Sequence, residues 1–406
     1  MEGNMKSKKN GFIGAALASL VIATMFGAPA AHATPTTITI WTDLNRASAF
    51  QAWARTYNRN HPLVVVNVVG KDGAKDKLAT VADGDAPDLI VGAHDWIGPL
   101  KAQGMILPVT LANASQFAER DKAAFNLKGA TYGVPMTVEN VALFTNMNLV
   151  RKVPKTFAEF EADSKAFLKK HTKAKFALAV APGDAYHMYP FFSGLGGYIF
   201  GGTSGNWNVH DLGIANRTFL KNAPLIDKWY AEKLINANVT GDTALAAFTS
   251  NNAPFMITGP WNLDKIRLKN INYEISSVPT IIKGIKPVPF YGVQGVMMTK
   301  WAGPGKHNIK LKVNGVLADL TTKPTQLLIA NQTIRTPANL QARAKFKDVD
   351  SAAFLAAGQG AITMPQILEM GAVWTPVANA WGQVKAKKHA VDRFKAAKST
   401  VSKAIK

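Results

Sequence analysis

The sequence predicts an α/β protein that is large enough for two domains, and three observations support this prediction. Apolar, β-branched runs alternate with amphipathic helical stretches near the start of the chain and again in its middle. The 406 residues, 47% of them hydrophobic, can fill two ordinary cores. Only 18% of the residues are charged and no long internal repeat is visible, so a disordered chain and a repeat protein are excluded.

The N-terminus is typical of an export signal. Three lysines at 6–9 precede an apolar stretch at 12–27, which is shorter than a membrane span requires, and Ala-His-Ala at 31–33 offers a small-residue cleavage site. We expect residues 1–33 to be a signal peptide that is cleaved after Ala33, which places the protein outside the cytoplasmic membrane, associated with the cell envelope. An uncleaved anchor is the alternative. The chain has no cysteine, so no lipid-modified Cys is available at the cleavage site.

The chain is strongly basic, with a formal net charge of +21. Residues 1–33 carry three Lys and one Glu, so removing them leaves +19. Such an excess favours weak attraction to anionic surfaces of the envelope and a position peripheral to the membrane. The lysines are scattered except in the C-terminal segment from Lys385. Zinc-finger spacing, helix-turn-helix signals and basic runs with stacking aromatics are missing from the sequence, so we expect no nucleic-acid partner.

The first predicted unit begins after residue 33 and alternates strands with helices. The run TITIW is rich in β-branched residues, and the stretch after it places Phe50, Trp53 and Tyr57 on one helical face. Pro62 ends that helix and a second apolar run follows it. From these patterns we expect strands at 34–45, 63–70 and 88–93 and helices at 46–62 and 75–82.

Polar and aromatic side chains follow the ends of these strands. Ligands of open α/β sheets bind outside the carboxyl ends of the strands. The candidates for ligand contact are therefore Trp41, Asp43, His94, Asp95 and Trp96. Two of them have a structural alternative. Asp95 is better explained as the cap of a helix that starts at Trp96, and His94 fits a buried, hydrogen-bonded position equally well.

A second α/β unit occupies the middle of the chain. Residues 130–150 have the pattern of a strand, a crossing that contains Glu139, and another strand. Thr156, followed three residues later by Glu159, is a capping box that starts a helix. Beyond it we expect a strand at 175–182, a long helical region at 216–237, a strand–turn–helix at 252–266, a strand at 273–280 and a mostly helical C-terminal part.

The sequence argues against most enzyme classes. The lack of cysteine excludes thiol nucleophiles and Cys-ligated metals. The eight histidines show no metal-ligand spacing, GPGKH at 303–307 is too short for a phosphate-binding loop, and no nucleophile elbow is present. We therefore expect no catalytic residue, metal or cofactor. Two carboxylates from Asp43, Glu139 and Asp184 could still make a glycoside hydrolase.

Aromatic residues beside turns suggest a carbohydrate site. The C–H face of a pyranose packs on an aromatic ring, while carboxylates accept its hydroxyl protons in charge-assisted hydrogen bonds. For each tryptophan, ordinary core packing is the alternative. The aromatic candidates are Trp41, Trp96, Tyr186, Trp261 and Trp374, and the carboxylates near them are Asp43, Glu139 and Asp184.

Six motifs, in order, carry a family resemblance. They are ITIWTDLNRASAFQAWARTY, GDAPDLIVGAHDWIGPLKAQGMI, GATYGVPMTVENVALFTNMNLV, PKTFAEF, ITGPW and MPQILEMGAVWTPV. With them the chain resembles the maltose/maltodextrin-binding protein family, the extracellular solute-binding proteins of carbohydrate ABC importers. The resemblance implies an α/β, periplasmic-binding-protein-like (type II) fold, with two discontinuous lobes joined by a hinge and a ligand cleft between them. The implied division is lobe one at 34–137 and 291–334, and lobe two at 138–290 and 335–406.

The resemblance also implies roles for single residues. Glu139 on the first crossing and Asp43 after the first strand would accept sugar hydroxyls. In lobe two it implies an acidic contact at Asp184, aromatic contacts at Tyr186, Trp261 and Trp374, and an apolar contact at Met364. The chain departs from the family at Gly92, Trp96 and Thr375, where the family has Trp, Arg and Tyr. One stacking plane is lost at Gly92, and Trp96 offers one nearby, so the subsites need not suit maltose.

The function implied is capture of maltose, maltodextrin or a related oligosaccharide by hinge closure and its delivery to an ABC permease. No enzymatic activity is implied, and we expect a monomer. Three alternatives stay open: a secreted glycoside hydrolase, a basic protein that binds envelope polymers, and a binder of a non-sugar solute.

Overall fold

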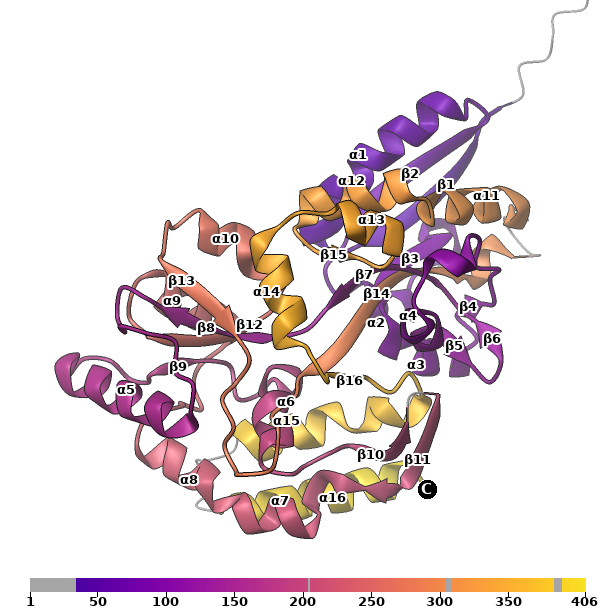
Figure 1. Cartoon of the computed structure of the whole chain (residues 1–406). Coiled ribbons are helices and arrows are strands. Elements are labelled where there is room, and N and C mark those ends of the chain that lie inside the picture. Colours follow the sequence, from indigo (N-terminus) through magenta and orange to yellow (C-terminus); the bar gives the residue numbers. More distant parts are fainter. Residues whose placement is uncertain (1–33, 204, 304–308, 383–388) are drawn as a thin grey trace, which may run out of the picture. The chain divides into compact units, whose positions relative to one another are not determined.

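The computed structural model describes residues 34–203, 205–303, 309–382 and 389–406. The predicted signal peptide and part of the lysine-rich segment from Lys385 lie outside the described residues. The chain divides into two units, Met1–Thr34 and Pro35–Lys406, and all described helices and strands belong to the second. Two separate main sheets in this unit, each covered by helices, make the two-lobed α/β fold that the sequence predicts (Figure 1).

The first lobe is built on an eight-stranded sheet with the main order β15-β7-β14-β3-β1-β2. Strands β1, β2 and β3 run parallel, and β14 is antiparallel to both β3 and β7. The carboxyl ends of the parallel strands therefore meet at one edge of the sheet. The strands are β1 (Thr36–Thr42), β2 (Val64–Gly70), β3 (Leu89–Ala93), β4 (Ile106–Leu107), β7 (Val134–Glu139), β14 (Phe290–Thr299), β15 (Thr336–Pro337) and β16 (Ile362–Thr363).

Both faces of this sheet are buried, because successive side chains point to opposite sides and helices cover each side. On β3, Leu89 and Val91 pack with the core under one helical layer, whereas Ile90 packs with the core on the other face. The first layer holds α1 (Leu44–Asn60), α11 (Lys310–Leu320) and α12 (Lys323–Thr333), and α13 (Leu340–Lys345) packs against α12. The other face carries α2 (Ala74–Leu78), α3 (Ile97–Ala102) and α4 (Glu119–Ala124). The hairpin β5–β6 (Asn126–Leu127, Ala130–Thr131) follows α4.

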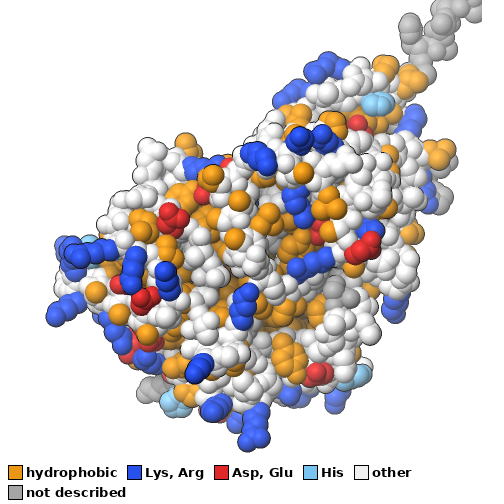
Figure 2. Space-filling view, viewed as in Figure 1, with side chains coloured by type: hydrophobic (Ala, Val, Ile, Leu, Met, Phe, Trp, Pro, Cys, Tyr) orange, Lys and Arg blue, Asp and Glu red, His pale blue; other side chains and the backbone are white. Residues whose placement is uncertain are grey.

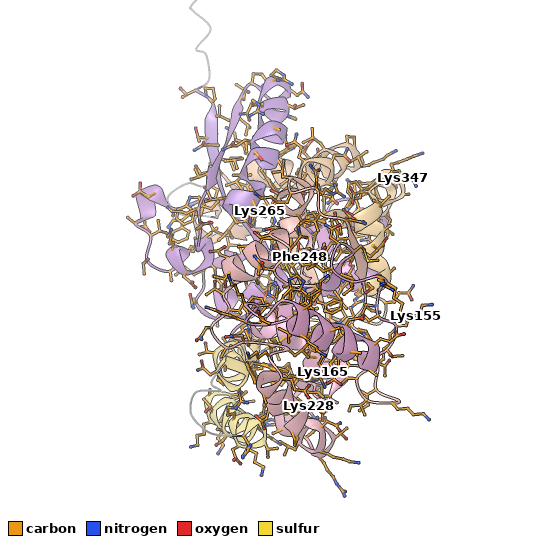
Figure 3. All side chains as sticks on the ribbon, turned by 90° about the vertical axis from the view of Figure 1, so that its left-hand side faces the viewer. Lys155, Lys165, Lys228, Phe248, Lys265 and Lys347 are labelled. Carbon is orange, nitrogen blue, oxygen red and sulfur yellow. The ribbon has the colours of Figure 1, made fainter. Side chains whose placement is uncertain are left out.

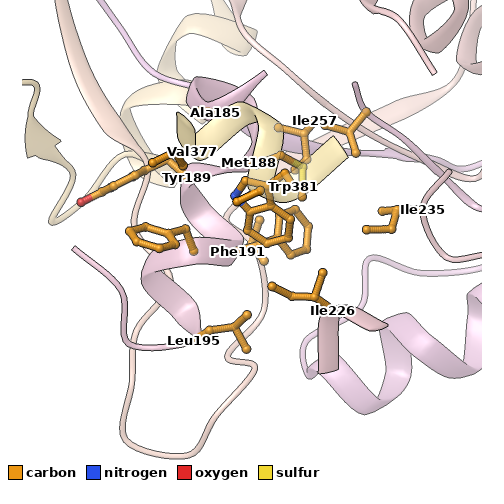
Figure 4. Close-up of a cluster of buried hydrophobic side chains, with 14 of the residues drawn as sticks. Ala185, Met188, Tyr189, Phe191, Leu195, Ile226, Ile235, Ile257, Val377 and Trp381 are labelled. Atoms are coloured by element: carbon orange, nitrogen blue, oxygen red, sulfur yellow. The ribbon is translucent and has the colours of Figure 1, made fainter. Parts of the chain in front are cut away.

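The second lobe is built on a four-stranded sheet in the order β13-β8-β12-β9. Its larger core joins Leu143 and Phe255 to the surrounding helices, and Figure 4 shows part of it, with Phe191, Ile226 and Trp381 packed together. The elements are β8 (Ala142–Asn146), α5 (Phe157–Lys170), β9 (Leu178–Ala179), α6 (Ala185–Gly194), β10 (Phe200–Thr203), β11 (Asn206–Leu212), α7 (Arg217–Asn222), α8 (Pro224–Ala231), α9 (Gly241–Thr249), β12 (Phe255–Thr258), α10 (Leu263–Arg267), β13 (Tyr273–Ser276), α14 (Val349–Ala357), α15 (Trp374–Gly382) and α16 (Ala390–Ala404).

The chain crosses between the two lobes at several points, and β16 returns briefly to the larger sheet between α14 and α15. The first joins β7 to β8, so the predicted strand–crossing–strand over 130–150 is confirmed. The second joins β13 to β14. The third follows α13 and leads to α14, which packs on β13. The return into the first lobe extends past the expected limit at residue 334, because β15 pairs with β7 and α13 packs on α12.

Several helix and strand predictions hold and others need correction. Thr156 and Glu159 form the expected capping box at the start of α5. The expected helix at 216–237 is two helices, α7 and α8, because Pro224 starts a new helix after Ala223. The expected strand at 175–182 pairs only over Leu178–Ala179.

The basic side chains are spread over the surface. Figure 2 shows Lys and Arg scattered over the visible face, and Figure 3 shows Lys155 and Lys347 extending outward while Phe248 belongs to a buried core. Some lysines are paired: Lys228 lies 2.9 Å from Glu161. None of the helices in the described ranges is long and apolar enough to cross a membrane.

Candidate functional site

A cavity of about 580 Å³, here called the cleft, is lined by side chains of both lobes. The first lobe contributes the end of β3, the end of β7 and one residue of β14, and the second contributes the start of α6, the turn before α10 and the start of α15. Seven of the eleven predicted binding residues line it, which makes it the candidate site. The lining residues are Ala93, Asp95, Glu139, Gly183, Asp184, Ala185, Tyr186, Trp261, Gln294, Met364, Trp374, Thr375 and Ala378.

Asp184 is held at the cleft as the N-cap of α6. Its Oδ1 atom accepts hydrogen bonds from the backbone N–H groups of Tyr186 (2.9 Å) and His187 (3.2 Å), and its Oδ2 atom lies 2.6 Å from Nδ1 of His187. Burial alone would raise the pKa of Asp184, but these hydrogen bonds outweigh burial and lower the pKa below its ordinary value. Asp184 is therefore an ionised acceptor at neutral pH.

Tyr186 and Trp261 form an aromatic corner on the second lobe. Their ring centroids are 6.1 Å apart with an interplanar angle of 47°. The Trp261 ring lies against Gly259, where an added Cβ would be 2.1 Å from the ring, so the glycine makes room for the indole. The Tyr186 hydroxyl is buried and has no hydrogen-bond partner among the described residues. Burial raises the pKa of Tyr186 well above its ordinary value, so the phenol stays neutral and can donate a hydrogen bond.

A second indole comes from Trp374, the first residue of α15. It meets Phe290 edge-on, with centroids 5.9 Å apart and an interplanar angle of 72°. Met364 lies near it in the lining and is 4% exposed. The next residue, Thr375, and Ala378, one turn along α15, add small side chains to this wall, and Trp374 itself is half-buried.

Glu139 ends β7 at the first crossing and is 6% exposed. Its Oε1 atom accepts a hydrogen bond of 2.6 Å from Nε2 of Gln294. Its Oε2 atom lies 3.6 Å from Nε of Arg335 and has no hydrogen-bond partner in the described parts of the chain. The carboxylate thus keeps acceptor capacity for a ligand hydroxyl.

Asp95 lines the cleft from the first lobe and does not have the role that its sequence position favoured. The short 3₁₀ turn that contains it leads into α3, whose N-cap is Trp96 and shows no side-chain capping bond, so the expected cap at Asp95 is wrong. Burial raises the pKa of Asp95, and the neighbouring His94 and Trp374 side chains work in the opposite direction. Asp95 therefore lines the cleft, and its carboxyl group does not cap α3.

Two predicted binding residues belong to the core instead. Trp41 is 2% exposed and packs among the apolar side chains on one face of the larger sheet. His94 is fully buried, with Nδ1 accepting the N–H of Val293 (3.1 Å) and Nε2 2.9 Å from the carbonyl oxygen of Met364. Burial lowers the pKa of His94, so the neutral imidazole links the cleft wall at Met364 to β14. The buried alternative for His94 is confirmed.

Asp43 and Trp96 lie outside the cleft lining. Asp43 caps α1 by accepting the backbone N–H of Arg46 at 3.0 Å, and its other oxygen pairs with the Arg46 guanidinium at 2.5 Å. The half-buried Trp96 ring covers Gly92, whose Cβ, if present, would be 2.1 Å from it. The indole of Trp96 therefore takes up the space beside β3 that a side chain at Gly92 would need.

Gln294 and Arg335 were missed from the sequence. Gln294 had a signal: it is an isolated amide within the otherwise apolar run FYGVQGVMM of β14, where an unpaired polar group would be costly. No signal in the sequence indicates a role for Arg335, because its partner Glu139 is distant along the chain and only the pairing of β15 with β7 brings the two residues together.

A second cavity of about 780 Å³ has Phe290 in its lining. It is lined in part by Phe200, Trp207 and Arg120, and it contains none of the predicted binding residues. Among the described residues, no group of three or more His, Cys, Asp or Glu is placed to hold a metal ion. The larger cavity has two carboxylates, Glu119 and Asp211, and the single indole of Trp207 in its lining. The smaller cleft has three carboxylates and two indoles, all of them among the predicted binding residues.

Comparison with known proteins agrees with this chemistry. A family described as bacterial extracellular solute-binding protein matches residues 52–307. The maltodextrin-binding protein of Bacillus subtilis is 28% identical over 326 residues, covering 77% of this chain and 76% of the relative. A galactooligosaccharide-binding protein of the same organism is 27% identical, with 84% and 83% covered. A maltooligosaccharide ABC transporter solute-binding lipoprotein of Streptococcus pneumoniae is 26% identical, with 90% and 88% covered.

Proposed function

Because the chain belongs to the bacterial extracellular solute-binding proteins, it is a binding protein and not an enzyme, and we propose that its ligand is an oligosaccharide of the maltodextrin class. The observation that carries the proposal is the lining of the cleft. Indoles from Trp261 and Trp374 offer apolar faces for pyranose rings, and Asp95, Glu139 and Asp184 offer acceptors for hydroxyls.

The distribution of these groups supports closure around the ligand. Asp95 and Glu139 come from the first lobe, whereas Asp184 and both indoles come from the second. A sugar that touches both sets binds more tightly when the lobes approach each other, so it shifts the population toward the closed form by its differential affinity. We propose that the closed form delivers the sugar to an ABC permease.

The relatives support a maltooligosaccharide over other sugars, since two of the three described above bear names of that class and one is named for a galactooligosaccharide. Thr375 lines the cleft where the family that the sequence resembles has a tyrosine, and we infer that the smaller side chain leaves room for a further sugar unit. We therefore propose a linear ligand of more than two glucose units, with the extra unit near Thr375.

The experiment is a thermal-shift and calorimetry screen of the protein against maltose, maltotriose, maltotetraose and a galactooligosaccharide, with sucrose as a control. A ligand present at about 100 times its Kd stabilises the folded form by about 2.7 kcal/mol, which is a measurable rise in Tm. We expect the largest rise with maltotriose or maltotetraose. A larger rise with the galactooligosaccharide would change the proposed substrate, and no rise with any sugar would overturn the function.

The cellular arrangement is also proposed. We infer that residues 1–33 direct export, that the mature protein is a monomer, and that its net charge holds it at the anionic envelope. Washing intact cells with low and high salt tests the last point, because salt screens charge attraction and should release the protein. Retention at high salt would indicate an uncleaved N-terminal anchor instead.

A further inference from the structure

Arg335 is a buried cation whose position is set by an unusual turn. The residue before it, Ile334, ends α12 with φ 52 and ψ 43, a left-handed conformation that a β-branched side chain rarely adopts. After this turn the chain continues through Arg335 into β15. The side chain of Arg335 is 3% exposed. A conformation of this kind persists only where the surroundings enforce it, so the placement of Arg335 has a cause nearby.

The cause is the register between β15 and β7. Thr336 pairs with Val138 and Pro337 with Thr137 in an antiparallel ladder, and continuing the ladder by one residue sets Arg335 opposite Glu139. The Nε atom of Arg335 lies 3.6 Å from Oε2 of Glu139.

The Arg335 guanidinium has no better partner. Its Nε and Nη1 atoms are buried without a hydrogen bond to any described residue. The other charged groups that act on it are Arg46 and Asp43 from the start of α1, which pair with each other, and Asp264 from α10. A buried cation without a hydrogen bond is costly, so the charged group nearest to it matters for its stability.

The neighbour of this cation is Glu139, a buried carboxylate in the wall of the cleft whose Oε2 atom has no hydrogen-bond partner among the described residues. Gln294 on β14 donates to Oε1, which fixes the orientation of the carboxylate but adds no positive charge. Tyr186 faces it from α6 with a neutral hydroxyl. Arg335 is thus the cation at ion-pair distance from Glu139 in the described structure.

We propose that Arg335 is a positioning residue of the sugar site: it holds Glu139 as an oriented anion so that the free capacity of the carboxylate is presented to a hydroxyl of the bound oligosaccharide. Arg335 does not line the cleft and does not touch the sugar. This inference rests on the proposed function. It adds Arg335 to the site as a residue that acts on the sugar only through Glu139.

The test is a double-mutant cycle with Arg335→Met and Glu139→Gln, measured by calorimetry with maltotriose. We expect Arg335→Met to weaken binding roughly 10- to 100-fold in the parent, the scale of the coupling energy between two residues in one polar network. In the Glu139→Gln background, the same substitution should change affinity less than about threefold, because no anion is left to hold. Arg335→Lys should restore most of the affinity, since it keeps the charge.

A matched control separates positioning from general stability. Arg343 also pairs with a buried carboxylate of the first lobe, Asp121, at 2.9 Å, but lies outside the cleft lining. Arg343→Met should lower Tm and leave sugar affinity unchanged. If Arg335→Met does not fold, Arg335→Gln takes its place in the cycle.

Two outcomes overturn the inference on its own: an equal loss of affinity in both backgrounds, or no loss in the parent. If the parent protein binds none of the sugars screened, the proposed function fails and this inference fails with it.

Discussion

Replacing Trp374 by alanine removes one of the two indoles that face the cleft. The ring is half-buried, and its inner part already packs edge-on against Phe290. Only the accessible face is available for a sugar, so only that face should enter the loss of affinity.

The magnitude follows from the area of that face. A tryptophan offers at most about 250 Å² of side-chain surface, and a stacked pyranose covers roughly a third of it, or about 80 Å². At about 25 cal/mol per Å², this contact contributes about 2 kcal/mol, which is about a 30-fold change in Kd. We therefore expect Trp374→Ala to weaken maltotriose binding about 30-fold.

The assay is isothermal calorimetry on the folded variant, with its Tm measured without ligand to record any structural damage. Trp207→Ala is the matched control, since this half-buried indole donates to Gln366 at 3.3 Å and does not line the cleft. Unchanged affinity in Trp374→Ala, or an equal loss in both variants, would refute the assignment of Trp374 to the sugar site.

Three further predictions concern charge and stability. Burial raises the pKa of Asp95, so the ionised side chain lowers the stability of the protein at pH values above its unfolded pKa. Asp95→Asn should therefore raise the Tm of the unliganded protein at neutral pH and weaken sugar binding about tenfold. A lower Tm would contradict this prediction. Burial lowers the pKa of His94, so the free energy of unfolding should fall as the pH drops below about 6.5. In urea unfolding at several pH values, His94→Gln should lose less stability over this range than the parent protein. Thr156→Ala removes the cap of α5 and should cost about 1 kcal/mol in urea unfolding without altering sugar affinity; a weakened affinity would tie α5 to the site.

The sequence predicts the elements of the fold because their signals are local. The helix that carries Phe50, Trp53 and Tyr57, the capping box at Thr156 and the two strands flanking Glu139 each depend on neighbouring residues. Helix boundaries fail where one residue outweighs a pattern, as at Pro224.

The site is harder to predict because both faces of the larger sheet are buried. A strand buried on both sides loses the alternation that tells which side chain points inward. Trp41 and Asp95 therefore look alike in the sequence, one at the end of β1 and one just after β3, although Trp41 is core and Asp95 lines the cleft.

Partners distant in the chain cannot be read from local patterns at all. His94 is fixed by the backbones of Val293 and Met364, and Glu139 is held by Gln294 and Arg335. These contacts exist only once β14 and β15 have returned to the sheet of the first lobe.

The most direct measurement is a crystal structure of the protein with maltotriose bound. We predict glucose rings stacked on Trp261 and Trp374, with hydroxyls within hydrogen-bond distance of Glu139 and Asp184. A sugar seated instead in the larger cavity beside Trp207, or one that touches a single lobe without bringing the two together, would contradict the proposed mode of capture.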